Sequence, residues 1–554
     1  MATSTKSSAV KRFLIGKPIP TSEDAHQRLS KKIALPVFAS DAISSTAYAT
    51  EEILIVFLSL GAVGMAAYSM LVPISLIVIA LLTIVVISYR QTIFAYPNGG
   101  GSYIVSKENL GEYPGLVAGA SLLIDYVLTV CVSVAGGVAA IISAFNGLAP
   151  YRVQICIGFV LLMMVANLRG LKESGALFAP PTYLYVLSLI ALIVVGLYRV
   201  FVQHLPPIEH TGEAQHLLEM QGSVTAFYFL KAFSSGAVAL TGVEAVSNGV
   251  PAFKKPESKN ASITLIWMAV ILGSCFFGLS ILAQHLQPVK DHEGIIPNTV
   301  LAQLAEQVYG GRNIFFYTTQ FATFAILILA ANTSYADFPR LSSLIAKDNY
   351  LPRQFSNRGD RLVYSNGVIF LSFASIGLLV AFKGQISALI PLYAVGVFTG
   401  FTLSQAGMVV HHYKYREPKW KLHMAVNAVG SVTTFFVAGI FVVVKFTDGA
   451  WIPAILIPIM MIGFKGIHRH YTRVRSFLLP SEDYVAPFHT HFVIVLVGSV
   501  NQGTMQAVRY AQSLRPDRLI AISVIETAED RQKIDEAWVK FNLSDVELQT
   551  VTSE

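Results

Sequence analysis

Long apolar segments recur through the first 465 residues of this chain, and no other feature limits its fold so strongly. A helix needs about 20 mostly apolar residues to cross the hydrocarbon core of a bilayer. We predict twelve membrane-spanning helices, at residues 33–60, 64–88, 116–146, 154–168, 180–202, 224–248, 262–284, 314–336, 365–382, 386–410, 423–445 and 449–465. The fourth and the last are short, and polar residues or glycines interrupt the first, third, sixth and tenth.

The charge content supports the same fold class. Only 13% of the residues are charged, whereas soluble globular proteins carry roughly 25%. The aromatic content of 11% and the three cysteines exclude a disordered chain and a secreted disulfide scaffold. The sequence therefore predicts an all-α polytopic membrane protein. We attribute its net charge of +7 to membrane topology and predict no nucleic-acid partner.

Lysine and arginine are concentrated in the connections that follow the even-numbered segments, among them 254–259, 340–361 and 414–421. Cytoplasmic connections of membrane proteins carry such an excess of positive charge. Because the number of predicted segments is even, we expect both termini on the cytoplasmic side of a multi-pass plasma-membrane protein.

The pattern changes from about residue 485. His491–Val497 is a short β-rich apolar run, Thr504–Leu514 is helix-like, and Leu519–Ile525 is a second apolar run. This order is typical of a β-loop-α-β unit with parallel strands, although the segment is short for a complete domain. The predicted organisation is a cytoplasmic arm at 1–32, a twelve-helix transmembrane domain at 33–465, a basic linker at 466–484 and a partial α/β domain at 485–554.

The first segment is the most polar of the twelve, because Asp41, Ser44, Ser45 and Tyr48 lie close together in it. An ionisable group inside a bilayer is costly and is a functional hypothesis by default. Small hydroxyl side chains compete with the backbone for hydrogen bonds, so we expect the helix to break here. Broken backbone at membrane depth is tolerated only around a cavity. The structural alternative is a satisfied polar kink between helices.

The sixth segment repeats this pattern. Gly236 and Gly242 loosen it, and Thr241 and Glu244 lie three residues apart on one helix face. The first and sixth segments are corresponding members of a five-plus-five inverted repeat. Interrupted segments at corresponding positions of two halves indicate the binding site of a transporter.

Two further segments add candidate residues. In the third, Asp125 and Thr129 lie four residues apart and share a helix face, which suits a water-filled path; a buried structural carboxylate is the alternative. In the tenth, Tyr393 lies between Pro391 and Gly396, where core packing is as reasonable a role as binding.

The chemistry of these side chains favours a monovalent cation. A zwitterionic amino acid needs backbone N–H groups for its carboxylate, usually at a glycine-rich helix break. The first segment instead offers Asp41 and has no glycine at its break. Carboxylate, hydroxyl and carbonyl oxygens suit a hard, poorly coordinating cation, and crowded acids leave at least one able to carry a proton. This reasoning does not separate K⁺ from Na⁺.

Three stretches carry a resemblance to a known family: SDAISSTAYATEE in the first segment, LLIDYVLT in the third and SSGAVALTGVEAVSNGVPAFKKP in the sixth. With its D-x(6)-Y and T-G-x-E patterns, the membrane part resembles the amino acid–polyamine–cation (APC) superfamily. Within that superfamily it is most similar to the KimA-type proton-coupled potassium importers, which are related to the KUP family. The C-terminal segment is similar to their cytoplasmic domains, which resemble universal stress proteins.

The resemblance implies a LeuT-like fold, alternating access and a homodimer held through the cytoplasmic segments, and some family members are inhibited by cyclic di-AMP. It also implies roles for single residues. The implied K⁺ ligands are Asp41, Tyr48, Asp125, Thr129 and Thr241, and Tyr393 falls where the family has a tyrosine beside the ion. From the polar break itself, we add Ser44 and Ser45 to the candidate ion-binding residues. Glu244 is the implied proton-coupling acid.

The predicted function is secondary active import of K⁺ coupled to H⁺. We predict no enzyme activity and no cofactor, since K⁺ and H⁺ are the transported ions. An amino acid or polyamine/H⁺ symporter of the same superfamily is the first alternative, and an ion-sensing membrane receptor is the second.

Overall fold

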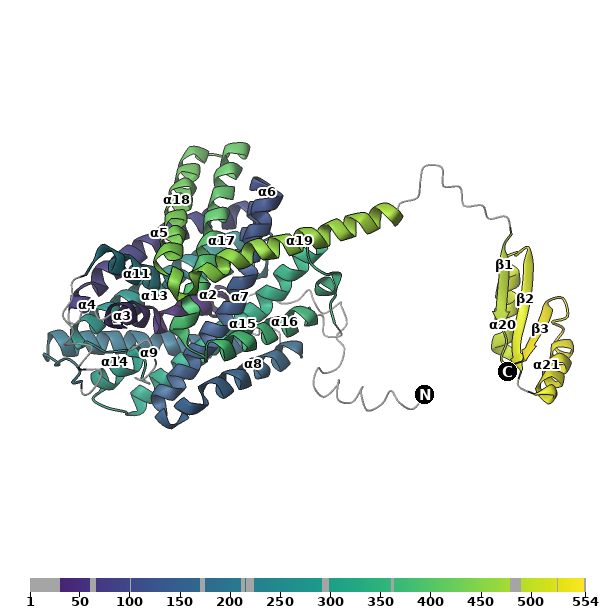
Figure 1. Cartoon of the computed structure of the whole chain (residues 1–554), viewed down its shortest axis with the longest axis horizontal. Coiled ribbons are helices and arrows are strands. Elements are labelled where there is room, and N and C mark those ends of the chain that lie inside the picture. The colour runs from purple at the N-terminus through teal and green to yellow at the C-terminus, as the bar shows by residue number, and fades with distance from the viewer. Residues whose placement is uncertain are drawn as a thin grey trace. The chain divides into compact units, whose positions relative to one another are not determined.

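The structure, a computed structural model, describes residues 30–59, 66–99, 101–169, 175–210, 215, 224–290, 298–359, 363–478, 490–525 and 527–552. The chain divides into two compact units, Met1–Thr472 and Arg473–Glu554, shown in Figure 1. Residues 1–29 of the predicted arm and 479–484 of the predicted linker lie outside the described residues.

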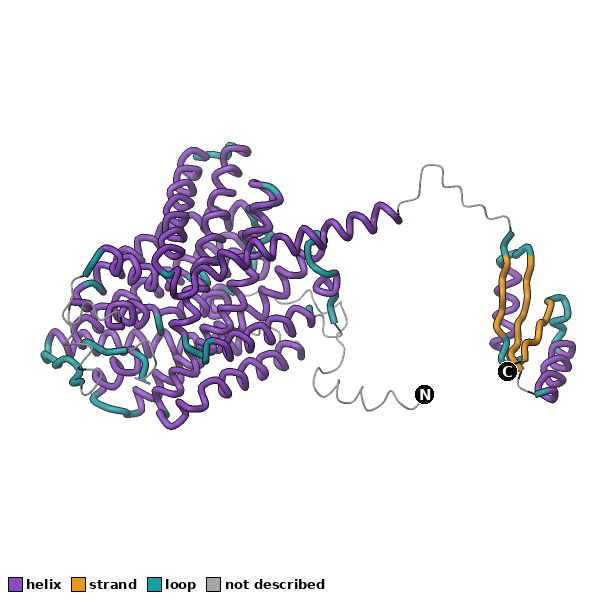
Figure 2. Tube along the Cα trace, viewed as in Figure 1, coloured by secondary structure: helices purple, strands orange, loops and turns teal. Residues whose placement is uncertain are grey.

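The regular elements described in the first unit are helices joined by loops, as Figure 2 shows. Its elements are α2 (Lys31–Ser44), η2 (Ser45–Ala47), α3 (Ala49–Ser59), α4 (Ala66–Ser69), α5 (Leu71–Ala95), α6 (Ser102–Leu110), α7 (Glu112–Ala144), η3 (Asn146–Tyr151), α8 (Arg152–Leu168), α9 (Gly175–Phe201), α11 (Ala226–Ala237), η4 (Val238–Leu240), α12 (Ala245–Asn248), η5 (Val250–Ala252), α13 (Glu257–Leu286), α14 (Val300–Tyr309), α15 (Ile314–Lys347), η6 (Arg353–Ser356), α16 (Ser365–Ala381), α17 (Ile386–Tyr415), α18 (Trp420–Val444), η7 (Phe446–Ala450) and α19 (Trp451–Leu478).

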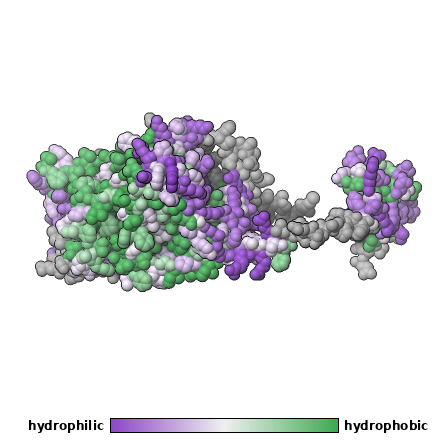
Figure 3. Space-filling view, turned by 90° about the horizontal axis from the view of Figure 1, so that it is seen from above, coloured by the Kyte–Doolittle hydropathy of each residue, from purple (hydrophilic) through white to green (hydrophobic). Residues whose placement is uncertain are grey.

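Within the described residues, ten helices are long and apolar enough to cross a membrane. Two of the predicted segments are not among them. The first is divided into α2 and α3 by a break, and the ninth is α16, an apolar helix of 17 residues. Much of the visible face of this unit is hydrophobic in Figure 3, which suits contact with lipid.

The helix α7 lies at the centre of this unit, since 89% of its apolar window is buried. It packs against α15 and α17, and α17 also packs against α18. The third and tenth predicted segments are unbroken, because the polar and glycine residues that interrupt their sequence pattern lie within the continuous helices α7 and α17. The first and sixth segments are broken as predicted, by η2 and by η4 with its following turn.

The second unit is a small α/β domain. It consists of β1 (Phe492–Leu496), α20 (Gln502–Ser513), β2 (Arg518–Ile525), α21 (Ala528–Lys540) and β3 (Glu547–Thr552). The strands are parallel in the order β1-β2-β3, with Val493 opposite Leu519 and Ile520 opposite Glu547. The predicted β-α-β unit is therefore present, whereas α21 and β3 were not predicted, because α21 is mostly charged and β3 is short and largely polar.

One face of this small sheet packs against helices in a buried apolar cluster, and the other face exposes apolar side chains. Val508 of α20 and Trp538 of α21 belong to the buried cluster beside Ala521 of β2. In contrast, Ile494 and Leu496 of the edge strand β1 are 56% and 81% exposed. Strand β1 therefore offers both a free backbone edge and an apolar surface within the described residues of this unit.

Candidate functional site

The breaks in the first and sixth segments lie against each other. In the first, Ser45 starts the short helix η2, and its Oγ donates to the carbonyl oxygens of Ala42 at 2.5 Å and Ala239 at 3.0 Å. Ala239 lies in η4, at the break in the sixth segment. A single serine hydroxyl is thus hydrogen-bonded to a carbonyl oxygen of each interrupted segment. Both carbonyls therefore keep a hydrogen-bond partner inside the membrane.

Gly242 brings the second break onto the carboxylate of the first. Its φ of +78° is a conformation that residues with a side chain rarely adopt. A Cβ atom at this position would lie 2.6 Å from Asp41 Oδ2 and 2.7 Å from the Ala42 nitrogen. The backbone of the sixth segment can approach Asp41 this closely only because residue 242 is glycine.

The hydroxyl side chains around Asp41 explain why the first helix breaks. Ser44 Oγ donates to the Asp41 carbonyl oxygen at 2.7 Å, and Thr46 Oγ1 donates to the Ile43 carbonyl oxygen at 2.7 Å. These side-chain bonds use carbonyls that would otherwise continue the helix. Tyr48 follows the short helix η2 and lies beside Asp41 and Thr241. The break therefore gathers four of the predicted site residues, Asp41, Ser44, Ser45 and Tyr48.

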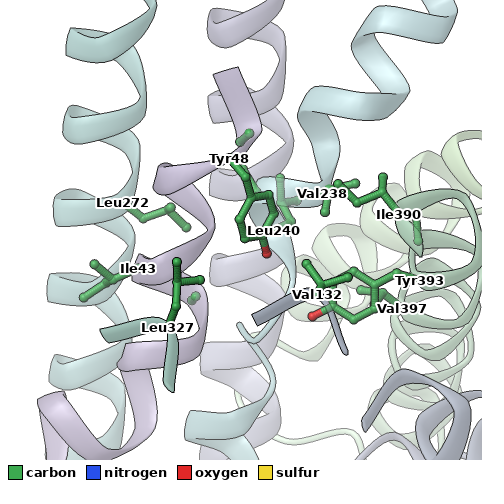
Figure 4. Packing of buried hydrophobic residues seen from close by; sticks show 14 of the residues in the cluster. Ile43, Tyr48, Val132, Val238, Leu240, Leu272, Leu327, Ile390, Tyr393 and Val397 are labelled. Carbon is green, nitrogen blue, oxygen red and sulfur yellow. The ribbon is translucent and has the colours of Figure 1, made fainter. Parts of the chain in front are cut away.

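The helices α7 and α17 supply the opposite side of the site. Thr129 Oγ1 donates to the Tyr393 hydroxyl at 3.0 Å, so the predicted pair from the third and tenth segments is in direct contact. Gly396 allows this approach, since its Cβ position lies 3.0 Å from the Ser121 carbonyl oxygen of α7. Figure 4 shows Tyr48 and Tyr393 with their phenol oxygens directed into the same region between the helices.

Glu244 joins the second break to α5 and α6. Its Oε2 accepts hydrogen bonds from Ser102 Oγ at 2.8 Å and from the Tyr89 hydroxyl at 3.3 Å. Its Oε1 is buried and has no hydrogen-bond partner in the described structure. The glycine-containing stretch before α6 lies against the same segment, because the Cβ position of Gly101 is 2.7 Å from Asn248 Oδ1.

The site is strongly acidic. Asp41, Asp125 and Glu244 are only 8%, 7% and 6% exposed, and they interact electrostatically with one another. No lysine, arginine or histidine of the described residues forms an ion pair with any of the three. Within the described part of the chain, the buried oxygens there that have no hydrogen-bond partner include Asp125 Oδ1, Glu244 Oε1 and Asn248 Oδ1. Buried carboxylates need a counter-charge or a proton, so the arrangement favours a bound cation.

One acid of this region was missed by the sequence analysis. Asp337 of α15 acts electrostatically on Asp41 and Glu244, and it lies 3.7 Å from the Arg340 guanidinium. The predicted eighth segment ended at residue 336, immediately before Asp337, whereas α15 continues to Lys347. The polar run from Asn332 to Tyr335 was the available signal that the path extends along this helix.

The donor set is that of an alkali-metal ion rather than of a transition metal. Among the described residues, no group of three or more histidine, cysteine or acidic side chains is arranged to hold a metal ion. The site consists of carboxylate, hydroxyl and backbone oxygens, which are hard ligands suited to weakly coordinating cations.

A second group of charged residues lies around the first turn of α3, on the side predicted to be extracellular. We call Glu51, Glu52, Lys231, Lys445 and Asp448 the outer cluster. Asp448 Oδ2 lies 2.8 Å from Lys231 Nζ and 3.7 Å from Lys445 Nζ. Glu52, which interacts electrostatically with Lys445, accepts a hydrogen bond from Ser387 Oγ at 3.0 Å, and Glu51 accepts one from the Val300 nitrogen at 2.7 Å.

The outer cluster therefore connects both broken segments, through α3 and α11, to α14, α17, α18 and η7. Lys445 and Glu52 are only 4% and 2% exposed. Buried charges of this kind are costly unless they are paired.

Comparisons with known proteins match the helical part and the C-terminal part of the chain to two different family models. Residues 35–464 match the family model described as amino acid permease, and residues 489–554 match the one described as the KimA potassium transporter C-terminal domain. The chain is 45% identical to the potassium transporter KimA of Bacillus subtilis over 535 residues, covering 96% of this chain and 86% of that protein. It is 27% identical over 440 residues to a probable potassium transport system protein Kup of Methylococcus capsulatus, covering 76% of this chain and 66% of the relative.

Proposed function

The chain belongs to the amino acid permease family and, within it, to the relatives of the potassium transporter KimA, and on this basis we propose that it is a secondary transporter that imports K⁺ together with H⁺. It is a transporter rather than an enzyme, as its relatives are. The proposed proton coupling and the proposed inward direction of transport rest on the family resemblance.

The observation that carries the proposal is the unbalanced negative charge at the two helix breaks. Asp41, Asp125 and Glu244 are buried together with unpartnered oxygens, and no described basic side chain forms an ion pair with them. A monovalent cation and a proton between them would neutralise this charge. The names of the relatives identify the cation as K⁺.

The proposed roles of single residues combine the family resemblance with the contacts described above. The proposed K⁺ ligands are Asp41, Tyr48, Thr241 and Tyr393 at the breaks, with Asp125 and Thr129 as a second position and the backbone around Ser44 and Ser45 as a source of carbonyl oxygens. Glu244 is the proposed proton-coupling acid. Its hydrogen bonds from Ser102 and Tyr89 hold Oε2, while Oε1 stays free to bind a proton.

The proposed mechanism is alternating access in a LeuT-like fold of twelve membrane crossings with a five-plus-five repeat. The broken first segment and α16 would be the two crossings beyond the ten long helices. The outer cluster would close the extracellular side. On the opposite side, Lys107 of α6 pairs with Asp348 at 2.6 Å, and this contact would help to close the path past Glu244.

Several wider features belong to the same proposal. Both termini would be cytoplasmic and the protein would lie in the plasma membrane. The C-terminal unit would mediate a homodimer, and the exposed Ile494 and Leu496 of β1 support this assignment because an apolar edge strand favours pairing. Regulation by cyclic di-AMP is proposed from the family resemblance alone.

Uptake of ⁸⁶Rb⁺ into proteoliposomes that contain a pH-sensitive dye tests this function. We expect Asp41→Asn to abolish uptake, because it removes the carboxylate at the break. We expect Glu244→Gln to abolish proton movement with the ion. The exposed carboxylate of Glu306, which pairs with Arg312, provides the matched control Glu306→Gln, and this variant should transport normally.

Full ⁸⁶Rb⁺ uptake by Asp41→Asn would contradict the ion-site assignment, and unchanged proton movement in Glu244→Gln would contradict the coupling. Labelled amino acids and polyamines are tested in the same vesicles. Their uptake without any dependence on K⁺ would establish the symporter alternative, and binding of K⁺ without transport would establish the receptor.

A further inference from the structure

A separate cavity lies at the end of the helical unit that carries the basic connections. Its volume is about 360 Å³, and we call it the basic-end cavity. Its lining residues are Ile87, Arg90, Gln91, Phe94, Ala95, His412, Glu417 and His423. They come from α5, α17, α18 and the connection between α17 and α18, and none has a role in the ion site or in the outer cluster.

One wall of the cavity is polar and has unused hydrogen-bonding capacity. His412 is 2% exposed, and neither of its ring nitrogens has a partner in the described part of the chain. Its ring lies 5.3 Å from that of His423, measured between centroids. Arg90 donates from Nε to Ser262 Oγ at 3.0 Å, and no ion pair joins it to a described carboxylate. A buried imidazole and a guanidinium with free N–H groups favour an acceptor such as a phosphate.

The other wall is apolar and faces the surroundings of the helices. Ile87 and Phe94 of α5 are 45% and 53% exposed, and α5 is one of the helices that can cross a membrane. These side chains therefore lie where lipid chains would contact the protein. An occupant that satisfies both walls must be amphipathic, with a polar group beside Arg90 and a hydrocarbon chain along α5.

The connection beside the cavity is strongly basic. Residues 414–421 contain four lysines and arginines and a single acid, Glu417. The Arg416 guanidinium lies 5.5 Å from the ring centroid of Tyr413 and 5.6 Å from that of Trp420. Basic and aromatic residues together are typical of the membrane–water interface, and basic pockets between membrane helices on the cytoplasmic side bind anionic lipid head groups.

We propose that the basic-end cavity binds the head group of an anionic phospholipid of the surrounding bilayer. The phosphate lies against Arg90, His412 and His423, and an acyl chain follows Ile87 and Phe94. Glu417 accepts hydrogen bonds from the hydroxyl groups of the head group, which distinguishes a glycerol head group from a choline one. The bound lipid joins α5 to α17, the helix that carries Tyr393, so it supports the packing behind the ion site.

Native mass spectrometry of the full-length chain, released from nanodiscs of defined composition, tests this site. The nanodiscs contain equal amounts of phosphatidylglycerol, phosphatidylethanolamine and phosphatidylcholine, and a parallel sample contains inorganic phosphate. We expect the wild-type chain to retain phosphatidylglycerol preferentially. In the double variant Arg90→Gln/His423→Gln this preference should fall by at least about fivefold.

The control is Lys347→Gln, which removes one exposed positive charge at the end of α15 and should keep the preference. Equal retention of the three lipids by the wild-type chain would overturn the proposal, and this result does not depend on whether a variant folds. Displacement of the lipid by inorganic phosphate at similar concentration would also overturn it, since the ligand would then be a free anion. The measurement needs no transport, so its outcome is independent of the proposed function.

Discussion

At the scale of single residues, Gly242 is the position where the candidate ion site tolerates the least change. It combines a positive φ with the closest approach of the second helix break to Asp41. Gly242 differs from the acids of the site, because the requirement at this position is that the residue has no side chain. The main chain of the sixth segment lies close to the Asp41 carboxylate here, with no room for a side chain between them.

We predict that Gly242→Ala strongly reduces transport without changing the amount of protein inserted in the membrane. The added methyl group would collide with Asp41 Oδ2 and the Ala42 nitrogen, and the backbone conformation costs about 1–2 kcal/mol for a residue with a side chain. Uptake of ⁸⁶Rb⁺ should fall at least about tenfold at equal amounts of inserted protein, since 1.4 kcal/mol corresponds to a factor of ten. The control is Gly158→Ala, where no heavy atom lies within 4 Å of the new carbon. Equal uptake by the two variants would show that the close approach is unimportant.

Several site residues could be predicted from the sequence because acids and hydroxyls are rare inside membrane segments. Asp41, Asp125 and Glu244 were recognised on that ground alone. Asp337 was not, because it lies just past the apolar window from which the eighth segment was predicted. The contact between Gly242 and Asp41 could not be predicted either, since it depends on how two distant helices are placed.

At the scale of elements, the first and sixth segments break for different local reasons. In the first, Ser44 and Thr46 bond to carbonyls three residues earlier, and in the sixth, Gly242 takes a positive φ. Along α7, Thr129 donates to Tyr393 of another helix instead of competing for its own backbone. Polar composition alone therefore did not separate the helices that break from those that continue.

The outer cluster gives a prediction about how these elements are held together. Lys445→Met leaves the buried Glu52 and the partly buried Asp448 without one of their cations. Removing one partner of a buried ion pair typically costs about 3–5 kcal/mol, so the thermal unfolding midpoint should fall clearly. The double variant Glu52→Gln/Lys445→Met should recover much of this loss, because both charges are then absent.

Thermal unfolding of the purified chain, followed by intrinsic fluorescence, measures both variants. Lys383→Met is the matched control, because Lys383 is an exposed lysine at the same end of the helices. If Lys445→Met unfolds at the temperature of the control, the charge pairs of the outer cluster do not stabilise the folded chain.

At the scale of the whole molecule, the two compact units differ in how completely they cover their apolar surfaces. The helical unit exposes apolar side chains that lipid can cover, whereas Leu496 of the C-terminal unit is 81% exposed on a strand with a free edge. The sequence predicted the β-α-β beginning of this unit from its apolar runs. It did not predict which face of the sheet the helices cover, because that depends on the crossover connections.

We predict that the chain is dimeric, as proposed above, and that Leu496→Lys converts it to monomers. A charge on an apolar pairing surface disfavours association, and mass photometry of the detergent-solubilised chain would detect the halved mass. Gln512→Lys, on the exposed surface of α20, adds the same charge and should remain dimeric. Dimers of unchanged stability in Leu496→Lys would place the interface elsewhere.

The exposed face of the C-terminal sheet has a consequence for how the amount of protein relates to its activity. If a second copy covers this face in the proposed homodimer, the fraction of chains that are dimeric depends on how many copies share one membrane. Cells that make few copies would then hold mostly single chains, and uptake per molecule would rise with expression level instead of remaining constant.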